Sequence, residues 1–121
     1  MEQLLIELEG RKTAYLPGET VRGKISWSCV AAPKTAELRL FWSTRGKGTV
    51  HSELVEGLRY DPVSPHETHS FEFKLPAEPY SFSGKLITLT WMLGLDVAEA
   101  DGAATEEIIV SPFGKEVRLH Q

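Results

Sequence analysis

The chain has 121 residues, a formal net charge of −4 and the apolar and charged fractions of an ordinary globular protein. A chain of this length can bury one sizeable core, so we expect a single domain over residues 1–121. The negative charge argues against nucleic-acid binding, which depends on clustered Lys and Arg, and no stretch approaches the roughly 18 apolar residues of a membrane span. We therefore expect neither a nucleic-acid partner nor membrane insertion.

The cysteine content and the N-terminus indicate a cytoplasmic protein. Cys29 is the single cysteine, whereas small secreted domains usually carry cysteines in pairs. Residues 1–7 are acidic where a signal peptide is basic, and their apolar run is too short for its hydrophobic region. Both observations favour a reducing compartment.

Apolar and polar residues alternate over strand-length windows, without a sustained helical stripe, which predicts an all-β fold. The first strand is expected near residues 3–9. Pro17 and Gly18 predict a type II turn, because proline presets the second turn position and glycine accepts positive φ at the third. The next strand is expected over residues 20–29, where Gly23 indicates either a close approach of another backbone or a bulge. Its core face holds Val21, Gly23, Ile25, Trp27 and Cys29.

A third strand is predicted over residues 36–43. It would bury Leu38, Leu40 and Trp42, and it would leave Phe41 on the solvent side.

The segments that follow are less regular. Residues 44–48 are typical of a hairpin tip, and residues 49–55 of a fourth strand whose two faces cannot be told apart. Two prolines and weak periodicity predict a long loop over residues 58–68.

Two strands in the second half carry strong signals. Phe71 and Phe73 would face inward in a strand that Pro76 ends, because proline has no N–H to donate. Every second residue from Ile87 to Val97 is apolar, which predicts a central core strand over this eleven-residue face.

The C-terminal part completes about seven strands. Residues 99–104 are typical of a hairpin loop, and residues 105–110 of the last strand. Residues 111–121 would add an edge strand or form a loose tail. Seven short strands in a chain of this size are typical of an immunoglobulin-like β-sandwich.

The order of several motifs resembles an arrestin-type domain. Residues 15–23, Tyr-Leu-Pro-Gly-Glu-Thr-Val-Arg-Gly, resemble its turn and strand opening, and residues 69–76, His-Ser-Phe-Glu-Phe-Lys-Leu-Pro, resemble its Phe-x-Phe-x-Leu-Pro strand. A glycine turn and a strand with a central aromatic residue follow in the same order. The residues that carry the resemblance are Tyr15, Pro17, Gly18, Glu19, Gly23, Phe71, Phe73, Leu75, Pro76, Gly84 and Trp91.

Members of this family, which include arrestins, a retromer subunit and a bacterial sporulation-control protein, have two such sandwiches in tandem, whereas this chain has room for a single lobe. The resemblance implies a noncatalytic adaptor or scaffold that binds another protein. It implies no phosphate sensing, because no residues here match the charged cluster that arrestins use for it. A single lobe also predicts a homodimer, formed through an edge strand or through Phe41.

Metal-ligand residue types occur at His66-Glu67-Thr68-His69. In a loop they would place two imidazoles on a metal, with His51 or Asp61 as a third ligand. The helical spacing of a zinc motif is missing, so we expect an exposed loop without a metal or cofactor. Cys29 is expected to be a buried, inert thiol beside Trp27.

No catalytic group is evident, and we expect no enzyme activity. No serine lies in a Gly-x-Ser-x-Gly turn. Glu106 and Glu107 are neighbours on a predicted strand, so they point to opposite faces and cannot act as a pair.

Two sets of residues are candidate binding surfaces. Phe41, with the basic Arg45 and Lys47 of the predicted hairpin tip, would contact a protein partner. The alternative function, a small-ligand or carbohydrate-binding sandwich, would use as its platform three aromatic residues that alternation does not place in the core, Tyr60, Tyr80 and Phe82.

Overall fold

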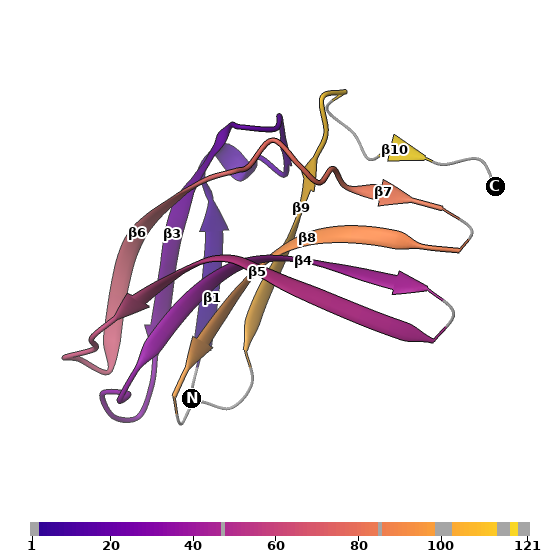
Figure 1. Ribbon diagram of the computed structural model, residues 1–121. Coiled ribbons are helices and arrows are strands. Elements are labelled where there is room, and N and C mark those ends of the chain that lie inside the picture. Colours follow the sequence, from indigo (N-terminus) through magenta and orange to yellow (C-terminus); the bar gives the residue numbers. More distant parts are fainter. Residues whose placement is uncertain (1–2, 47, 85, 99–102, 114–116, 119–121) are drawn as a thin grey trace.

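The structure is a computed structural model that describes residues 3–46, 48–84, 86–98, 103–113 and 117–118. Two β-sheets pack face to face across a cluster of buried apolar side chains (Figure 1). The predicted all-β, immunoglobulin-like class is confirmed, and seven of the described strands have six residues or more. The described elements are β1 (Gln3–Leu8), the 3-10 turn η1 (Glu9–Arg11), β2 (Ala14–Tyr15), β3 (Thr20–Ser28), β4 (Ala36–Gly46), β5 (Thr49–Tyr60), β6 (His66–Lys74), β7 (Phe82–Ser83), β8 (Thr88–Val97), β9 (Ala104–Val110) and β10 (Val117–Arg118).

The two sheets differ in size. The smaller has three antiparallel strands in the order β1-β3-β6, and the larger has the order β10-β7-β8-β4-β5, with β9 paired to β8 and β2 paired to β9. β5 and β6 are the end strands of their sheets on one side of the sandwich, where residues 61–65 connect them. At the C-terminal end, β10 lies parallel to β7. No helix in the described part of the chain has the length and apolarity that a membrane crossing requires.

β8 is the central strand of the core. Every second side chain from Leu89 to Val97 is buried. The predicted apolar face is one position shorter than expected, because Ile87 precedes the strand and is 46% exposed. The indole Nε1 of Trp91 donates to the carbonyl oxygen of Pro79 (2.9 Å), so the polar atom of this buried ring has a partner.

The turn predicted before β3 is confirmed. The N–H of Glu19 donates to the carbonyl oxygen of Leu16 (3.0 Å), and Gly18 has a φ of 82°. The Glu19 carboxylate accepts from the ammonium of Lys12 and from the N–H of Leu16 (2.8 Å), and these bonds lower its pKa, with Lys12 contributing most. The N–H of Leu75 donates to the Glu19 carbonyl (2.9 Å), which ties the turn to the end of β6.

The hairpin of β4 and β5 is longer than predicted. β4 extends to Gly46, so residues 44–46 belong to a strand rather than to a hairpin tip, and β5 begins at Thr49. The long loop predicted for residues 58–68 is wrong, since only residues 61–65 lie between β5 and β6. The cause is that β5 is an edge strand exposed on both faces, which leaves little alternation in its sequence.

A bulge also changes the phase of β5. Leu40 lies opposite Glu56 and Phe41 lies opposite Leu54, so Val55 has no partner in the register. Even-numbered residues of β5 therefore lie on the outer face up to Leu54 and on the inner face from Glu56 onward. This phase change explains why the faces of β5 could not be separated from the sequence.

Candidate interaction surface

The outer face of the larger sheet carries an apolar row across three strands. Phe41 in β4 lies opposite Leu54 in β5 and Met92 in β8, on the face away from the buried Leu40. The Phe41 ring is half-buried because it covers Gly94, on which a Cβ would lie 3.2 Å from Cε1 of the ring. Leu54 is 60% exposed. We call Leu54, Phe41 and Met92 the Phe41 row.

Polar groups border the Phe41 row on both sides. On one side, β4 presents Arg39, whose guanidinium donates from Nη1 to Oδ2 of Asp96 (2.7 Å) and from Nη2 to Oε1 of Glu37 (2.6 Å). On the other side lies a row of three hydroxyl groups, from Ser52, Ser43 and Thr90. An apolar centre with a polar rim is the usual composition of a protein interface.

Arg45 lies on the same face as Phe41, four residues further along β4, which is about 13 Å at the rise of a strand. It is exposed and stands opposite Val50 of β5 and Thr88 of β8. Lys47, the third residue of the predicted surface, lies outside the described residues. The outer face therefore holds Phe41 and Arg45 together.

Leu54 and Met92 were missed by the sequence analysis. The signal for Leu54 was available, because pairing Gly46 with Thr49 sets the register that places Leu54 opposite Phe41. The predicted tip over residues 44–48 concealed this register. Met92 could not be assigned without the pairing of β8 with β4, which are far apart in the sequence.

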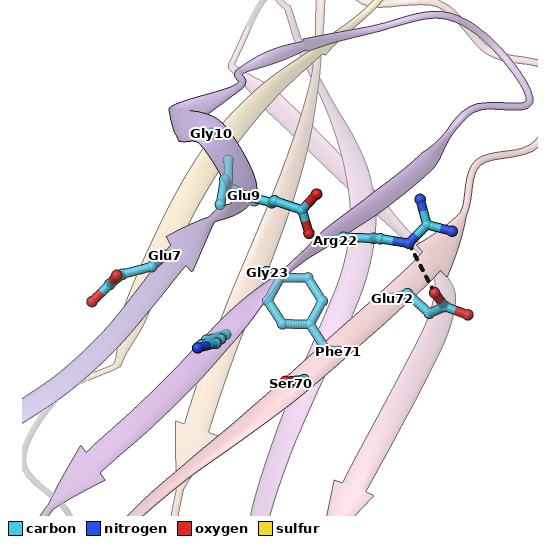
Figure 2. A pocket seen from close by; sticks show the side chains of 10 residues that line it. Glu7, Glu9, Gly10, Arg22, Gly23, Ser70, Phe71 and Glu72 are labelled. Atoms are coloured by element: carbon cyan, nitrogen blue, oxygen red, sulfur yellow. Dashed lines mark hydrogen bonds and ion pairs between the residues drawn. The ribbon is translucent and has the colours of Figure 1, made fainter.

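The outer face of the smaller sheet carries a shallow polar hollow of about 520 Å³ (Figure 2). Its lining includes Glu7 of β1, Arg22 and Lys24 of β3, and Ser70 and Glu72 of β6. Arg22 donates from Nε to Oε2 of Glu72 (3.1 Å), as Figure 2 shows. Because acidic and basic groups are interspersed, the hollow has no strong preference for an anion or a cation.

The histidines do not converge on a metal site. His66 lies on β6 rather than in the predicted loop, and His69 lies on the same strand; three positions along a strand place their side chains on opposite faces. His66 Nδ1 lies 2.8 Å from Oγ of Ser28, and His69 Nε2 lies 2.9 Å from Oε1 of Glu67. His51 is on β5, the edge strand of the other sheet. Among the residues that the structure describes, no three His, Cys, Asp or Glu side chains could hold a metal ion together.

His69 belongs instead to an aromatic cluster with residues from β3 and β5. Its ring lies 5.3 Å from that of Trp27 and 4.8 Å from that of Tyr60, centre to centre. The carboxylate of Glu67 accepts the backbone N–H groups of residues 63–64 (2.7 and 2.8 Å), so the connection between the two edge strands is held in place. The Tyr60 hydroxyl is buried and has no hydrogen-bond partner in the described structure. Burial raises the pKa of this phenol.

The predicted aromatic platform does not form. Tyr60 lies in the same row of the larger sheet as Val97, and Phe82 lies in the same row as Leu89. Eight residues of β8 separate those rows, which is about 26 Å. Tyr60 and the Tyr80–Phe82 segment are therefore at opposite ends of the sheet and cannot stack on one small ligand.

The remaining candidate groups occupy structural positions. Cys29 is buried, as predicted. Glu106 and Glu107 lie opposite Leu93 and Met92 of β8, so their side chains point to opposite faces of the sheet, also as predicted.

Comparison with known proteins defines the fold. No protein-family model matches the chain, and no curated protein sequence matches it. Among solved structures, it is similar to Spo0M, a sporulation control protein from Bacillus subtilis, with a TM-score of 0.64 and 23% identity. The match covers 91% of this chain and 49% of the Spo0M chain. The chain has the arrestin-like fold.

This arrestin-like sandwich corresponds to a single lobe and spans about half the length of Spo0M. The resemblance carried by residues 15–23 and 69–76 is thus confirmed. A β-glucosidase from Listeria innocua is also similar, with a TM-score of 0.50 and 16% identity, over 97% of this chain but only 16% of the enzyme. At such identities the likenesses establish the fold alone.

Proposed function

We propose that this arrestin-like sandwich is a noncatalytic adaptor or scaffold module that binds another protein on the outer face of its larger sheet. The observation that carries the proposal is the Phe41 row, an apolar row on three paired strands with a polar rim. The fold agrees with a regulatory role, since Spo0M is a sporulation control protein. We further propose a cytoplasmic location, because the chain has a single cysteine and that residue is buried.

The Phe41 row has the chemistry of a binding centre. Fully burying an exposed apolar side chain contributes about 1.5–3 kcal/mol. Leu54 is 60% exposed, so its burial under a partner would contribute most of this binding free energy. The half-buried Phe41 and Met92 would contribute less. Arg39 is already paired and would form a rim contact, whereas the exposed Arg45 would attract an acidic surface.

Capture from cells of the source organism tests the proposal. Met92→Lys places a charge at the β8 end of the Phe41 row, beside Phe41 and opposite the carboxylate of Glu107, and leaves the β5 edge unchanged. Leu5→Lys makes the same change in chemistry at an exposed residue on the outer face of the smaller sheet. We expect a protein that is captured by the wild type and by Leu5→Lys and is lost with Met92→Lys. Equal capture by all three proteins would show that the binding face lies elsewhere.

A second candidate function is the binding of a small polar ligand such as a saccharide, and the polar hollow is the observation that favours it. Arg22, Lys24 and Ser70 would donate to hydroxyl groups, and Glu7 and Glu72 would accept from them. A glycan array tests this directly. A hit that is lost on Arg22→Ala would support saccharide binding. An array without hits at millimolar affinity would rule this second function out.

A further inference from the structure

The first half of β5 is a free strand edge. Residues 49–54 precede the bulge, all of them are exposed, and β5 pairs only with β4 in the described chain. Such an edge offers unpaired N–H and C=O groups to another strand. The bulge itself and the charged Glu56 and Arg59 protect the second half of β5, as they do on many edge strands, but the first half contains neither a lysine nor a proline.

We propose that a second copy of this chain adds to this edge as an antiparallel strand, about a two-fold axis that passes midway between the two copies of Ser52. In that register His51 of each copy lies opposite Glu53 of the other, and Val50 of each lies opposite Leu54 of the other. The pairing therefore contains two His–Glu pairs on one face, in which an imidazole nitrogen and a carboxylate oxygen are hydrogen-bonding groups, and two apolar pairs on the other. Within one chain His51 Nε2 already lies 2.9 Å from Oε1 of Glu53, so both side chains extend along the same face.

Other registers are less favourable. Residues that oppose each other in an antiparallel pair share a face of the sheet, and side chains on one face of a strand are two residues apart. In a pair related by a two-fold axis, one residue must therefore lie opposite its own copy, with the axis between the two. An axis through Glu53 would bring two carboxylates directly opposite each other, which destabilises a pair of strands. An axis through His51 would oppose two imidazoles and would pair Val50 with Ser52. Of the registers centred on residues 51, 52 and 53, the one centred on Ser52 pairs imidazole with carboxylate and apolar with apolar side chains.

The pairing would also extend the Phe41 row. Val50 and Leu54 are both on the outer face, and they are 59% and 60% exposed. Val50 of one copy would lie beside Leu54 of the other, so the apolar row would continue across the axis. The inference does not depend on the proposed function, because it rests on the edge and the register of β5 rather than on a partner for Phe41.

A charge swap tests the register. We expect wild-type chains to associate with rising concentration in size-exclusion chromatography with light scattering. His51→Glu would place carboxylates opposite each other at two positions and should weaken association about tenfold or more. The double variant His51→Glu with Glu53→His restores both His–Glu pairs with the two residues exchanged and should dimerise like the wild type. A wild type that stays monomeric at the highest concentration, or a double variant no tighter than the single one, would overturn the proposal.

A cross-link tests the position of the axis. Ser52→Cys would place two thiols directly opposite each other, where Cβ atoms of paired strands are about 4.5–5.5 Å apart. Mild oxidation should then give a covalent dimer. Ser43→Cys is the matched control, because Ser43 lies in the same row one strand further from the axis, so its two copies would be about 14 Å apart. Equal cross-linking of the two variants, or none from Ser52→Cys, would contradict an axis at Ser52.

Discussion

The ring of Phe71 occupies the space that a side chain on Gly23 would need. The two residues lie opposite each other in β6 and β3. A Cβ on Gly23 would be 2.9 Å from Cζ of Phe71 and only 2.2 Å from the carbonyl oxygen of Glu7. The second of these neighbours is backbone and cannot rotate away. The close approach predicted at Gly23 is therefore confirmed, and an aromatic ring covers the glycine, as is common in stable sheets.

We expect Gly23→Ala to lower the free energy of unfolding by about 2–3 kcal/mol, because the methyl group would force β1 away from β3. Urea denaturation measures this loss. Gly57→Ala is the control, since its Cβ would first meet a flexible carboxylate oxygen of Glu37 at 3.3 Å, and it should change stability by only about 0.5 kcal/mol. Equal losses in the two variants would show that Gly23 is not sterically required.

Tyr15 and Tyr60 should respond differently to loss of the hydroxyl. Tyr15 donates from its hydroxyl to the carbonyl oxygen of Lys12 (2.8 Å), whereas the buried hydroxyl of Tyr60 has no partner in the described structure. Tyr15→Phe should therefore cost about 1 kcal/mol, and Tyr60→Phe should be neutral or stabilising by up to about 1 kcal/mol. Thermal denaturation of the two variants gives the comparison. A large loss with Tyr60→Phe would mean that this hydroxyl does have a partner.

The free energy of unfolding should depend on pH through Glu19, which lies in the turn before β3. The bonds from Lys12 and Leu16 lower its pKa below the ordinary value of 4.5. A group with a lowered folded-state pKa stabilises the fold above its unfolded pKa, and this contribution disappears as the pH falls through the folded value. Glu19→Gln should thus cost roughly 1 kcal/mol at neutral pH and progressively less below a pH of about 4.5.

Urea denaturation of Glu19→Gln and the wild type at neutral pH and at about pH 3 tests this dependence. Glu72→Gln provides the control, because the side chain of Glu72 is 65% exposed in its pair with Arg22 and the pair should contribute at most about 0.5 kcal/mol. A difference between wild type and Glu19→Gln that stays constant with pH would contradict the assigned role of the carboxylate.

Sequence patterns predicted the strands that have one buried face. β3 and β8 alternate clearly because the core takes every second side chain, and the Pro17-Gly18 turn follows from the conformations of its two residues. β5 was predicted too short because both of its faces are exposed and its bulge shifts the alternation. His66 was assigned to a loop, whereas the pairing of β6 with β3 extends as far as His66, which lies opposite Ser28.

The candidate surface could be predicted only in part. The position of Phe41 on the outer face followed from the alternation of β4. Its neighbours Leu54 and Met92 depend on pairing between strands, which the sequence of a single chain does not encode locally. The same reason explains why the predicted aromatic platform was wrong: alternation places neither Tyr60 nor Phe82 in the core, but both pack against it in different rows of the sheet.

The central claim is that another protein binds the outer face of the larger sheet. Photo-crosslinking in cells of the source organism tests it most directly, with a benzophenone amino acid introduced at Met92, in the Phe41 row, or at Leu5, on the opposite outer face. We predict an adduct with a second protein from position 92 and none from position 5. An adduct from position 5 alone, or no adduct from position 92, would contradict the claim.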